Sequence, residues 1–277
     1  MVSMLHEVAR LGFHREAEAY EHSRPTYPPD AVAWLVEHVR IRPGAVVVEL
    51  AAGTGKLTRL LVPTGAMVVA VEPVPGMQEV LRRLLPTVPA VSGTLPEALP
   101  FRSASVDAVC VAQAFHWFDA ERAFAELARV LRPGGRVGIL WNARDRSVDW
   151  VDRVWAIMDA VERHAPWRDH ENGRDAALDR RAGFGPLHTA TFRQEHALTP
   201  EGVVDRIRGV SHVAALDPAE QAVVLDDVWR VLAEHPDTRG RNELHVPYRV
   251  DCYWTELLTG TPGPESRTAR STCRPSP

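Results

Sequence analysis

Lysine is nearly absent from this chain, and its absence excludes two kinds of chemistry. Lys56 is the single lysine among 277 residues, so arginine carries almost all of the positive side-chain charge. A pyridoxal-phosphate enzyme would have to form its Schiff base on Lys56, inside a glycine-rich turn that cannot accommodate this role. A dehydrogenase of the Tyr-x-x-x-Lys type needs a lysine well after the strand predicted over residues 105–111, and none follows. Both enzyme classes are therefore excluded.

Cysteine, long apolar runs and net basic charge are also scarce. Cys110, Cys252 and Cys273 are too few and too scattered for a disulfide framework or a Cys-x-x-Cys metal site. No apolar run approaches the ~18 residues needed to span a bilayer, and residues 1–7 lack the pattern of a signal peptide. At a net charge of −4, the chain has no overall basic field to attract nucleic acid. We expect a cytoplasmic protein with no metal, membrane or nucleic-acid partner.

The run Val46–Thr58, V-V-V-E-L-A-A-G-T-G-K-L-T, is the most informative segment. Its β-branched residues predict a buried parallel strand, after which a glycine-rich turn opens into a helix. Glycines let the backbone approach a ligand closely, and the start of a helix presents unpaired N–H groups. The pattern indicates a nucleotide-type cradle, although a purely structural strand–turn–helix has the same local signature.

Spacing separates three kinds of cradle. A phosphate-binding P-loop needs glycine at position 50 and Ser or Thr at position 57. This chain has Leu50 and Leu57 there, so it does not match a P-loop. A dinucleotide-binding G-x-G-x-x-G turn needs a third glycine at Thr58. The third kind places an acid at the strand end, followed by small residues at alternate positions. This chain provides that pattern with Glu49, Ala51, Gly53 and Gly55.

A second acid ends the next apolar run. Met67–Val71 predicts another strand, and Glu72 and Pro73 follow it. An acid about 20 residues beyond the glycines is placed to accept both hydroxyls of a ribose. Removing a carboxylate from water costs free energy unless the group is paired or hydrogen-bonded, and two ribose hydroxyls would provide such hydrogen bonds. The alternative is a solvated acid at the tip of a strand.

Four later segments follow in order. Gly93–Phe101 and Ser105–Val109 come first, Val111–Asp119 continues with V-A-Q-A-F-H-W-F-D, and Leu131–Leu140 reads L-R-P-G-G-R-V-G-I-L. With the first acid and glycine turn, this set resembles the class I S-adenosylmethionine-dependent methyltransferases over roughly residues 20 to 142. The family's first motif is acid-x-Gly-x-Gly-x-Gly, so Ala51 replaces its first glycine and predicts a slightly wider turn. The A-Q-A-F-H-W-F-D variant resembles the type 11, ubiquinone/menaquinone-biosynthesis-like and trans-aconitate-methyltransferase-like branch, whose members are mostly small-molecule methyltransferases.

The resemblance implies an S-adenosylmethionine cofactor beyond the carboxyl ends of the strands, where open α/β sheets bind ligands. Arg24 is expected either to pair with the methionine carboxylate of the cofactor or to be a surface arginine in a proline-rich loop. The residues implied to bind the cofactor are Arg24, Glu49, Ala51, Gly53, Gly55, Glu72, Pro73, Met77, Thr94, Leu95 and Gln113.

Two further groups of residues are expected to form the acceptor pocket. The segment Tyr20–Pro28 matches a Y-x-x-x-R-P-x-Y-P pattern that in this family commonly lies over the cofactor, and its tyrosine rings would exclude water. Aromatic and polar residues after the fourth and fifth strands would complete the walls of this pocket. Arg144 could instead be an exposed surface residue. The expected pocket residues are Tyr20, Tyr27, Trp117, Phe118, Asn142 and Arg144.

His116 is the candidate catalytic residue. It follows the fourth strand between Phe115 and Trp117, and histidine titrates near neutrality, so it could remove a proton from a hydroxyl or an acidic carbon. The alternative is an imidazole that shapes the pocket or bonds to the backbone. An acceptor carboxylate would need no base.

Alternating strand and helix patterns predict an α/β, Rossmann-like, doubly wound fold. We expect a mostly parallel seven-stranded sheet with an antiparallel edge strand, because residues 186–197 and 244–254 alternate as the last two strands. Helices are expected over 7–20, 31–39, 119–131, 147–164, 200–216 and 218–233. The expected organisation is an N-terminal helical arm or lid over 1–40, a methyltransferase domain over 41–258, and a disordered tail over 259–277. Within the domain, 41–145 is the core and 146–258 the cap and edge strands.

The sequence therefore predicts an S-adenosylmethionine-dependent methyltransferase that moves a methyl group to an oxygen or carbon atom of a small molecule. Two alternatives stay open at this point. One is a methyltransferase acting on RNA or protein, which the acidic charge balance and the missing N/D-P-P-Y/F motif disfavour. The other is a non-catalytic S-adenosylmethionine-binding sensor or partner protein, which an intact cradle does not exclude. The acceptor and the oligomeric state are not encoded in any motif.

Overall fold

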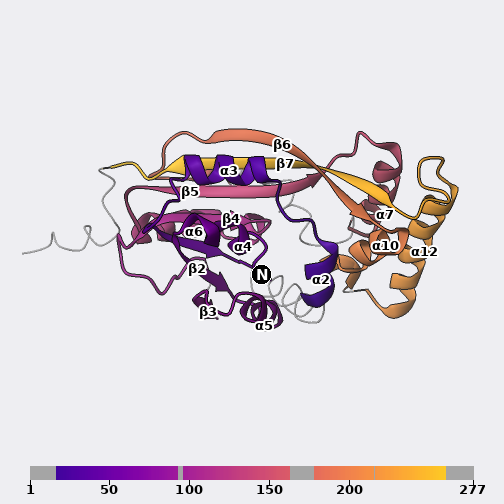
Figure 1. Ribbon diagram of the computed structural model, residues 1–277, viewed down its shortest axis with the longest axis horizontal. Coiled ribbons are helices and arrows are strands. Elements are labelled where there is room, and N and C mark those ends of the chain that lie inside the picture. The colour runs from indigo at the N-terminus through magenta and orange to yellow at the C-terminus, as the bar shows by residue number, and fades with distance from the viewer. Residues whose placement is uncertain (1–16, 93–95, 163–177, 215, 260–277) are drawn as a thin grey trace, which may run out of the picture.

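The computed structural model describes residues 17–92, 96–162, 178–214 and 216–259. It contains one seven-stranded sheet in the order β3-β2-β1-β4-β5-β7-β6 (Figure 1). Strands β1 to β5 run parallel to one another, and β7 runs antiparallel to both β5 and β6. This confirms the predicted Rossmann-like sheet with antiparallel pairing at one edge. The strands are β1 (Val46–Leu50), β2 (Met67–Glu72), β3 (Ala90–Ser92), β4 (Val106–Ala112), β5 (Leu131–Arg144), β6 (His188–Leu198) and β7 (Leu244–Glu256).

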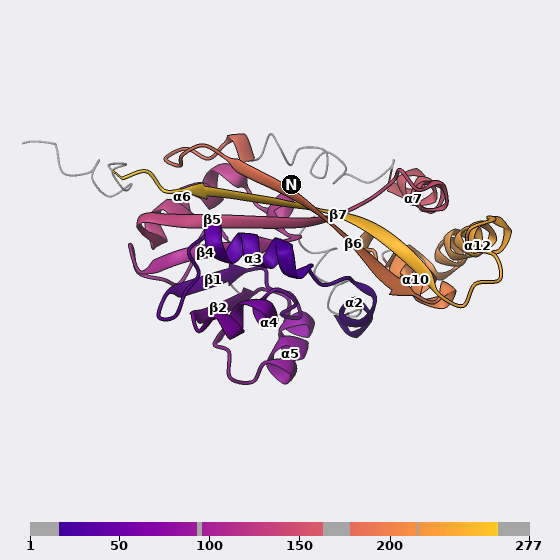
Figure 2. The same cartoon turned by 45° about the horizontal axis from the view of Figure 1, so that its top comes forward.

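Helices cover both faces of the sheet, as the run of valines in β1 predicts. Val47 packs with α3 and α4, whereas Val48 packs with α6 on the opposite face. Both valines are fully buried, because successive residues of a strand point to opposite faces and a parallel strand is covered on both. Figure 2 shows α3, α4 and α5 on one side of the sheet. The flanking elements are α3 (Pro29–His38), α4 (Thr58–Leu61), the 3₁₀ turn η1 (Val62–Thr64), α5 (Pro75–Leu84), the 3₁₀ turn η2 (Phe115–Trp117) and α6 (Ala120–Val130).

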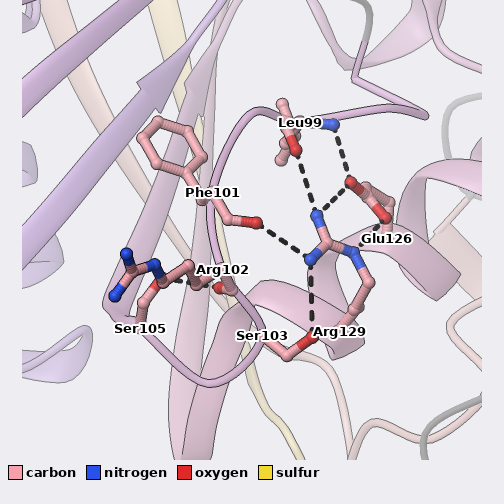
Figure 3. Close-up of polar contacts among 7 residues, drawn as sticks. All are labelled: Leu99, Phe101, Arg102, Ser103, Ser105, Glu126 and Arg129. Atoms are coloured by element: carbon pink, nitrogen blue, oxygen red, sulfur yellow. Dashed lines mark hydrogen bonds and ion pairs between the residues drawn. The ribbon is translucent and has the colours of Figure 1, made fainter. Parts of the chain in front are cut away.

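The loop before β4 is fixed to α6 by a charged pair (Figure 3). Arg129 forms an ion pair with Glu126 and donates hydrogen bonds to the carbonyls of Leu99 and Phe101 at 3.0 and 2.9 Å. Glu126 in turn accepts the backbone N–H of Leu99 at 2.6 Å. The segment that leads into β4 is therefore held along the second half of α6, where Ala104 and Ser105 also donate backbone hydrogen bonds to Arg129 and Val130.

A second hydrophobic core lies beyond the carboxyl ends of β5 and β6. Four helices surround the outer ends of β6 and β7 there, and we call them the cap: α7 (Asp149–Glu162), α10 (Pro200–Arg208), α11 (Ser211–Ala214) and α12 (Pro218–Glu234). Thr199 and Asp217 cap the starts of α10 and α12 through their side-chain oxygens. The apolar residues that hold the cap together include Trp150, Val154, Trp155, Ile207, Val228 and Tyr248.

The N-terminal arm, residues 17–28, connects the cap with the sheet. Its helix α2 (Ala17–Ser23) packs against both α5 and α10, as Figures 1 and 2 agree in showing. Ala17 is buried with Val74, Met77 and Val80. The arm therefore crosses the carboxyl edge of the sheet, where the ligand of an open α/β sheet binds.

Several boundaries differ from the sequence-based expectations. The helix expected over 200–216 is broken near Gly209, where the backbone N–H of Val210 turns back to the carbonyl of Ile207, and it forms α10 and α11 instead. The first helix continues to Ser23, beyond the expected end at residue 20, while residues 7–16 of that prediction lie outside the described residues. Residues 260–277 of the expected tail also lie outside them. None of the helices in the described part of the chain is both long and apolar enough to cross a bilayer.

Candidate functional site

The turn after β1, residues 51–56, adopts the conformation that its composition predicts; we call it the glycine turn. Ala51, Gly53 and Gly55 all have positive φ angles, of 51°, 59° and 85°. A Cβ added to Gly53 would meet no atom within 4 Å, whereas one added to Gly55 would lie 2.8 Å from a methyl group of Leu85. The two glycines thus have different roles. Gly53 leaves open space beside the backbone, and Gly55 allows the turn to pack closely against the end of α5.

Two buried carboxyl groups stand at the strand ends beside this turn. Glu49 and Glu72 are only 1% and 4% exposed. Glu72 accepts the backbone N–H of Gly53 at 2.7 Å and that of Val74 at 2.8 Å, and Glu49 accepts the hydroxyl of Thr58. Burial raises the pKa of Glu49 to about 8 and that of Glu72 to about 7, against the opposing effect of these hydrogen bonds.

Glu72 has the properties expected of an acceptor for sugar hydroxyls. Each of its oxygens accepts one N–H group and keeps lone-pair capacity, because an ionised carboxyl group offers about four acceptor positions. No cation of the described chain forms an ion pair with it at 4.0 Å or less, and its raised pKa reflects that uncompensated burial. Hydroxyl donors from a ligand would stabilise its charged form. The open space at Gly53 lies directly beside it, so these residues fit an adenosyl cofactor.

Glu21 ties the arm to the glycine turn, and no local sequence pattern revealed this role. Its carboxylate accepts the hydroxyl of Thr54 at 2.5 Å and forms an ion pair with Arg59 at 2.6 Å. The single lysine, Lys56, donates to the backbone carbonyl of Glu21 at 2.6 Å. The three partners come from a segment more than 30 positions away in sequence, so only the folded structure identifies the link.

Arg24 and the two tyrosines of the arm take different positions. The guanidinium of Arg24 lies over the ring of Tyr20, 5.0 Å from its centroid. Burial, with the nearby charge of Arg206, lowers the pKa of Arg24 to about 9. Tyr27 is buried in the core beside α3, where desolvation raises its pKa well above the ordinary value. Tyr20, with Arg24 over its ring, packs beside the cluster that the arm forms with α5, whereas Tyr27 belongs to the packing of the sheet.

The end of β5 is joined to the arm by the side chain of Asn142 and to the residue after β4 by a backbone hydrogen bond. Gln113 has a positive φ of 61°, and its backbone N–H donates to the carbonyl of Leu140 at 2.9 Å. Asn142 donates to the carbonyl of Thr26 at 3.1 Å and accepts from Gln194 at 2.9 Å. Asn142 thus holds the arm in place, and the prediction that it also contacts an acceptor stays a prediction.

His116 lies in the 3₁₀ turn η2 at the carboxyl end of β4. Its ring and that of Trp117 are 4.9 Å apart between centroids, and both residues are half-buried. Phe118 is buried in the main core with Phe115 and Phe124. The turn therefore exposes the histidine and tryptophan more than the phenylalanines, and the base role of His116 stays a prediction.

The other predicted residues are distributed along the same edge of the sheet. Met77 is buried against the arm helix, and Pro73 is half-buried after β2. Arg144, at the end of β5, lies over the ring of Trp155 in the cap at 4.7 Å. Thr94 and Leu95 lie outside the described residues. Within the described ranges, no group of three or more His, Cys, Asp or Glu residues is arranged to hold a metal ion.

The comparisons with known proteins agree with this geometry. A family model described as a methyltransferase domain matches residues 48–139. An uncharacterized methyltransferase of Mycobacterium tuberculosis is 40% identical over 242 residues, which cover 87% of this chain and 94% of the relative. An uncharacterized methyltransferase-like protein of Schizosaccharomyces pombe is 30% identical over 254 residues, covering 91% of this chain and 98% of the relative.

Solved structures support the same fold. The crystal structure of a protein assigned as a type II methyltransferase from Anaeromyxobacter dehalogenans aligns with a TM-score of 0.60 at 25% identity, over 85% of this chain and 98% of that one. A methyltransferase assigned to an antibiotic biosynthesis pathway of Anabaena variabilis aligns with a TM-score of 0.61 at 20% identity, over 83% of this chain and 98% of that one, and shows the fold alone. The sheet order, the glycine turn and the relatives lead to one conclusion: the chain belongs to the class I S-adenosylmethionine-dependent methyltransferases.

Proposed function

We propose that this protein binds S-adenosylmethionine and transfers its methyl group to an oxygen or carbon nucleophile of a small molecule. The observation that carries the proposal is the pairing of Glu72 with the open backbone of Gly53. A buried carboxyl group without a cation beside an unobstructed glycine matches a ribose and its neighbouring backbone contacts.

The residues of the glycine turn and the strand ends would hold the cofactor. Glu72 would accept the ribose hydroxyls, and Met77 and Pro73, beside it, would border the base. Arg24 would pair with the methionine carboxylate, because its buried guanidinium has no carboxylate partner within the described chain. Glu49 would support the turn from below through Thr58. The bound cofactor supplies an activated methyl group on a sulfonium, so the protein's contribution is alignment and exclusion of water.

The arm and cap favour a small acceptor over a macromolecule. The arm crosses the carboxyl edge of the sheet and is fastened to the glycine turn by Glu21 and to β5 by Asn142. The cap closes the same edge from the side of β5 to β7. A site that is covered from two sides would favour a small molecule that fits entirely inside it. We propose that the protein acts in the cytoplasm, with which its free, buried Cys110 and Cys252 are compatible.

His116 would act as the general base where the acceptor is a hydroxyl or an acidic carbon. Its place on η2, next to the half-buried Trp117, puts a titratable group at the end of β4. A base of this kind contributes typically about 10²- to 10⁴-fold to the rate. Trp117 would form part of the pocket wall and attract the positive sulfur by about 1 kcal/mol.

Calorimetric titration with S-adenosylhomocysteine, NAD and ATP tests the cofactor assignment. We expect S-adenosylhomocysteine to bind and the other two nucleotides to bind at least about a hundredfold more weakly, because the glycine turn lacks the third glycine of a dinucleotide site, where Thr58 stands, and the first glycine of a P-loop, where Leu50 stands. Tighter binding of NAD or ATP than of S-adenosylhomocysteine would refute the assignment.

A further inference from the structure

Two arginines, the half-buried Arg24 of the arm and the buried Arg206 of the cap, lie where the arm meets the cap, and the proposed cofactor accounts for only one of them. Arg206, on α10, is 3% exposed, and its Nε and Nη1 atoms have no hydrogen-bond partner in the described chain. The same holds for the buried Nε atom of Arg24. The two charges are close enough that Arg206 lowers the pKa of Arg24. Burying a guanidinium is unfavourable unless a partner compensates its charge, so the position of Arg206 requires an explanation.

The carboxylate nearest to the pair along the arm is already engaged. Glu21, three positions before Arg24, is paired with Arg59 and Thr54 at the glycine turn. Neither arginine forms an ion pair with any described carboxylate at 4.0 Å or less, although Arg208 on the same helix pairs with Asp205 at 2.5 Å. The sequence thus places a compensated arginine on the outside of α10 and an uncompensated one on the inside.

Two further buried polar atoms belong to the same region. Tyr248 of β7 is 2% exposed, its hydroxyl has no hydrogen-bond partner in the described chain, and its electrostatic influence reaches Arg24. His196 of β6 has a buried, unpartnered Nδ1 atom and feels the charge of Arg206. A hydroxyl and an imidazole N–H can both donate hydrogen bonds. These residues lie on elements that pack against one another, since α10 contacts both α2 and β6 and shares a hydrophobic cluster with Tyr248. Their buried polar atoms have no hydrogen-bond partner in the described chain.

We propose that Arg206, with the hydroxyl of Tyr248 and the ring of His196, is the binding site for an oxyanion group, a carboxylate or a phosphate, carried by the methyl acceptor. The inference rests on the proposed function and narrows it to an anionic acceptor. The methionine portion of the cofactor brings a single carboxylate, which Arg24 takes because the arm holds it beside the glycine turn. Arg206 comes from the opposite side, on the cap, so the second negative charge comes from the second substrate.

An oxyanion at this site could come from the methyl donor, S-adenosylmethionine, or from the methyl acceptor. A substitution of Arg206 distinguishes these two sources. Arg206→Met removes the charge and keeps an unbranched apolar side chain. Arg208→Met is the matched control, because Arg208 lies two positions away on the same helix with an exposed side chain. The probes are succinate, malonate and inorganic phosphate, with neutral succinamide as the comparison, titrated calorimetrically into protein saturated with S-adenosylhomocysteine.

We expect the wild type and Arg208→Met to bind at least one of the three anions and not succinamide, and Arg206→Met to bind it at least about tenfold more weakly. Arg206→Met should melt at the same or a higher temperature than the wild type, because it removes an uncompensated buried charge. Equal anion binding by Arg206→Met and wild type overturns the inference, as does a wild-type complex that binds none of the anions. A variant that melts far lower than the wild type indicates a structural arginine and overturns it as well.

A second titration identifies the source. 5′-Methylthioadenosine lacks the amino-acid portion of S-adenosylhomocysteine, so the ratio of the two affinities reports on the methionine carboxylate. We expect Arg206→Met to leave that ratio unchanged and Arg24→Met to reduce it. If Arg206→Met reduces it instead, the oxyanion is the donor's own and the acceptor assignment fails. Failure of S-adenosylhomocysteine to bind the wild type at all is a different result, which refutes the proposed function.

Discussion

Binding of S-adenosylhomocysteine should release a proton from Glu72, and the amount follows from the structure. Burial holds the pKa of this carboxyl group at about 7 in the ligand-free protein. Two ribose hydroxyls, added to the N–H groups of Gly53 and Val74, would favour the charged form and move the pKa well below 6. Binding would then release about 0.9 proton at pH 6, about 0.5 at pH 7 and about 0.1 at pH 8, and the affinity would rise about tenfold from pH 6 to pH 8.

Calorimetry in buffers of different ionisation enthalpy measures the released protons directly. Glu72→Gln provides the test, because a glutamine side chain has nearly the same shape and does not titrate. In this variant the release between pH 6 and 8 should disappear, and the affinity at pH 8 should fall about 10- to 100-fold through loss of a charged acceptor. Glu79→Gln, an exposed position on α5, is the matched control and should behave as the wild type.

The reasoning fails if Glu72→Gln releases as many protons as the wild type does, or if the wild type releases none at pH 6. A melting curve of Glu72→Gln accompanies the titration. One buried N–H group at the turn would face the new amide instead of an oxygen, so we expect a loss of about 1–3 kcal/mol in the free energy of unfolding. A folded variant that melts as one transition keeps the binding result interpretable.

Three further predictions concern single residues. Ala51→Gly should raise the free energy of unfolding by up to about 1 kcal/mol, measured by urea denaturation, because Ala51 has a φ of 51° and glycine avoids its Cβ strain; a loss of stability would contradict this. Glu49 has a pKa raised by burial to about 8, so the folded state retains a proton that the unfolded state has lost, and stability should fall between about pH 5 and 8; Glu49→Gln should flatten that dependence in melts across this range. His116→Ala should lower kcat about 100-fold or more with unchanged S-adenosylhomocysteine affinity if the imidazole is a base, whereas a change in KM alone would show a role in shaping.

The sequence predicts most of the fold because the strand ends carry their own signals. β1 and β2 are short apolar runs, each with an acid at or next to its end, and the register places Glu49 opposite Ala70 and Cys110. The start of α6 at Asp119 is similarly local, since its side chain accepts the N–H of Arg122. The order in which the later motifs follow along the sequence then indicates the family. These features depend on neighbours within a few positions.

The features that sequence analysis missed depend on contacts between distant segments. Glu21 looks like one acid of a polar helix until the fold brings Thr54 and Arg59 beside it. Arg206 follows Asp205 in an amphipathic helix, where a charged residue usually faces solvent, and only the packing of α10 against the arm buries it. The break after α10 is different, because Gly209 at the C-cap of this helix is a local stop signal that the expectation of one helix over 200–216 passed over.

The single lysine of the chain connects the glycine turn with the arm. Lys56 holds the backbone of Glu21, and Glu21 holds Arg59 and Thr54, so the turn that would meet the cofactor and the arm that would cover it are fastened to each other. Such a cover would exclude water from the reacting atoms, and an activated methyl donor mainly requires alignment and the exclusion of water from a protein.

The most direct test of the account is transfer of a labelled methyl group. The purified protein, S-adenosylmethionine with a deuterated methyl group and a metabolite extract are incubated together, and mass spectrometry identifies the compounds that gain the label. The account predicts at least one labelled product that carries a carboxylate or phosphate group, formed by the wild type and formed more slowly by Glu72→Gln when S-adenosylmethionine is not saturating. No labelled compound from any extract, with S-adenosylhomocysteine bound and the protein folded, would contradict the claim that this chain is a small-molecule methyltransferase.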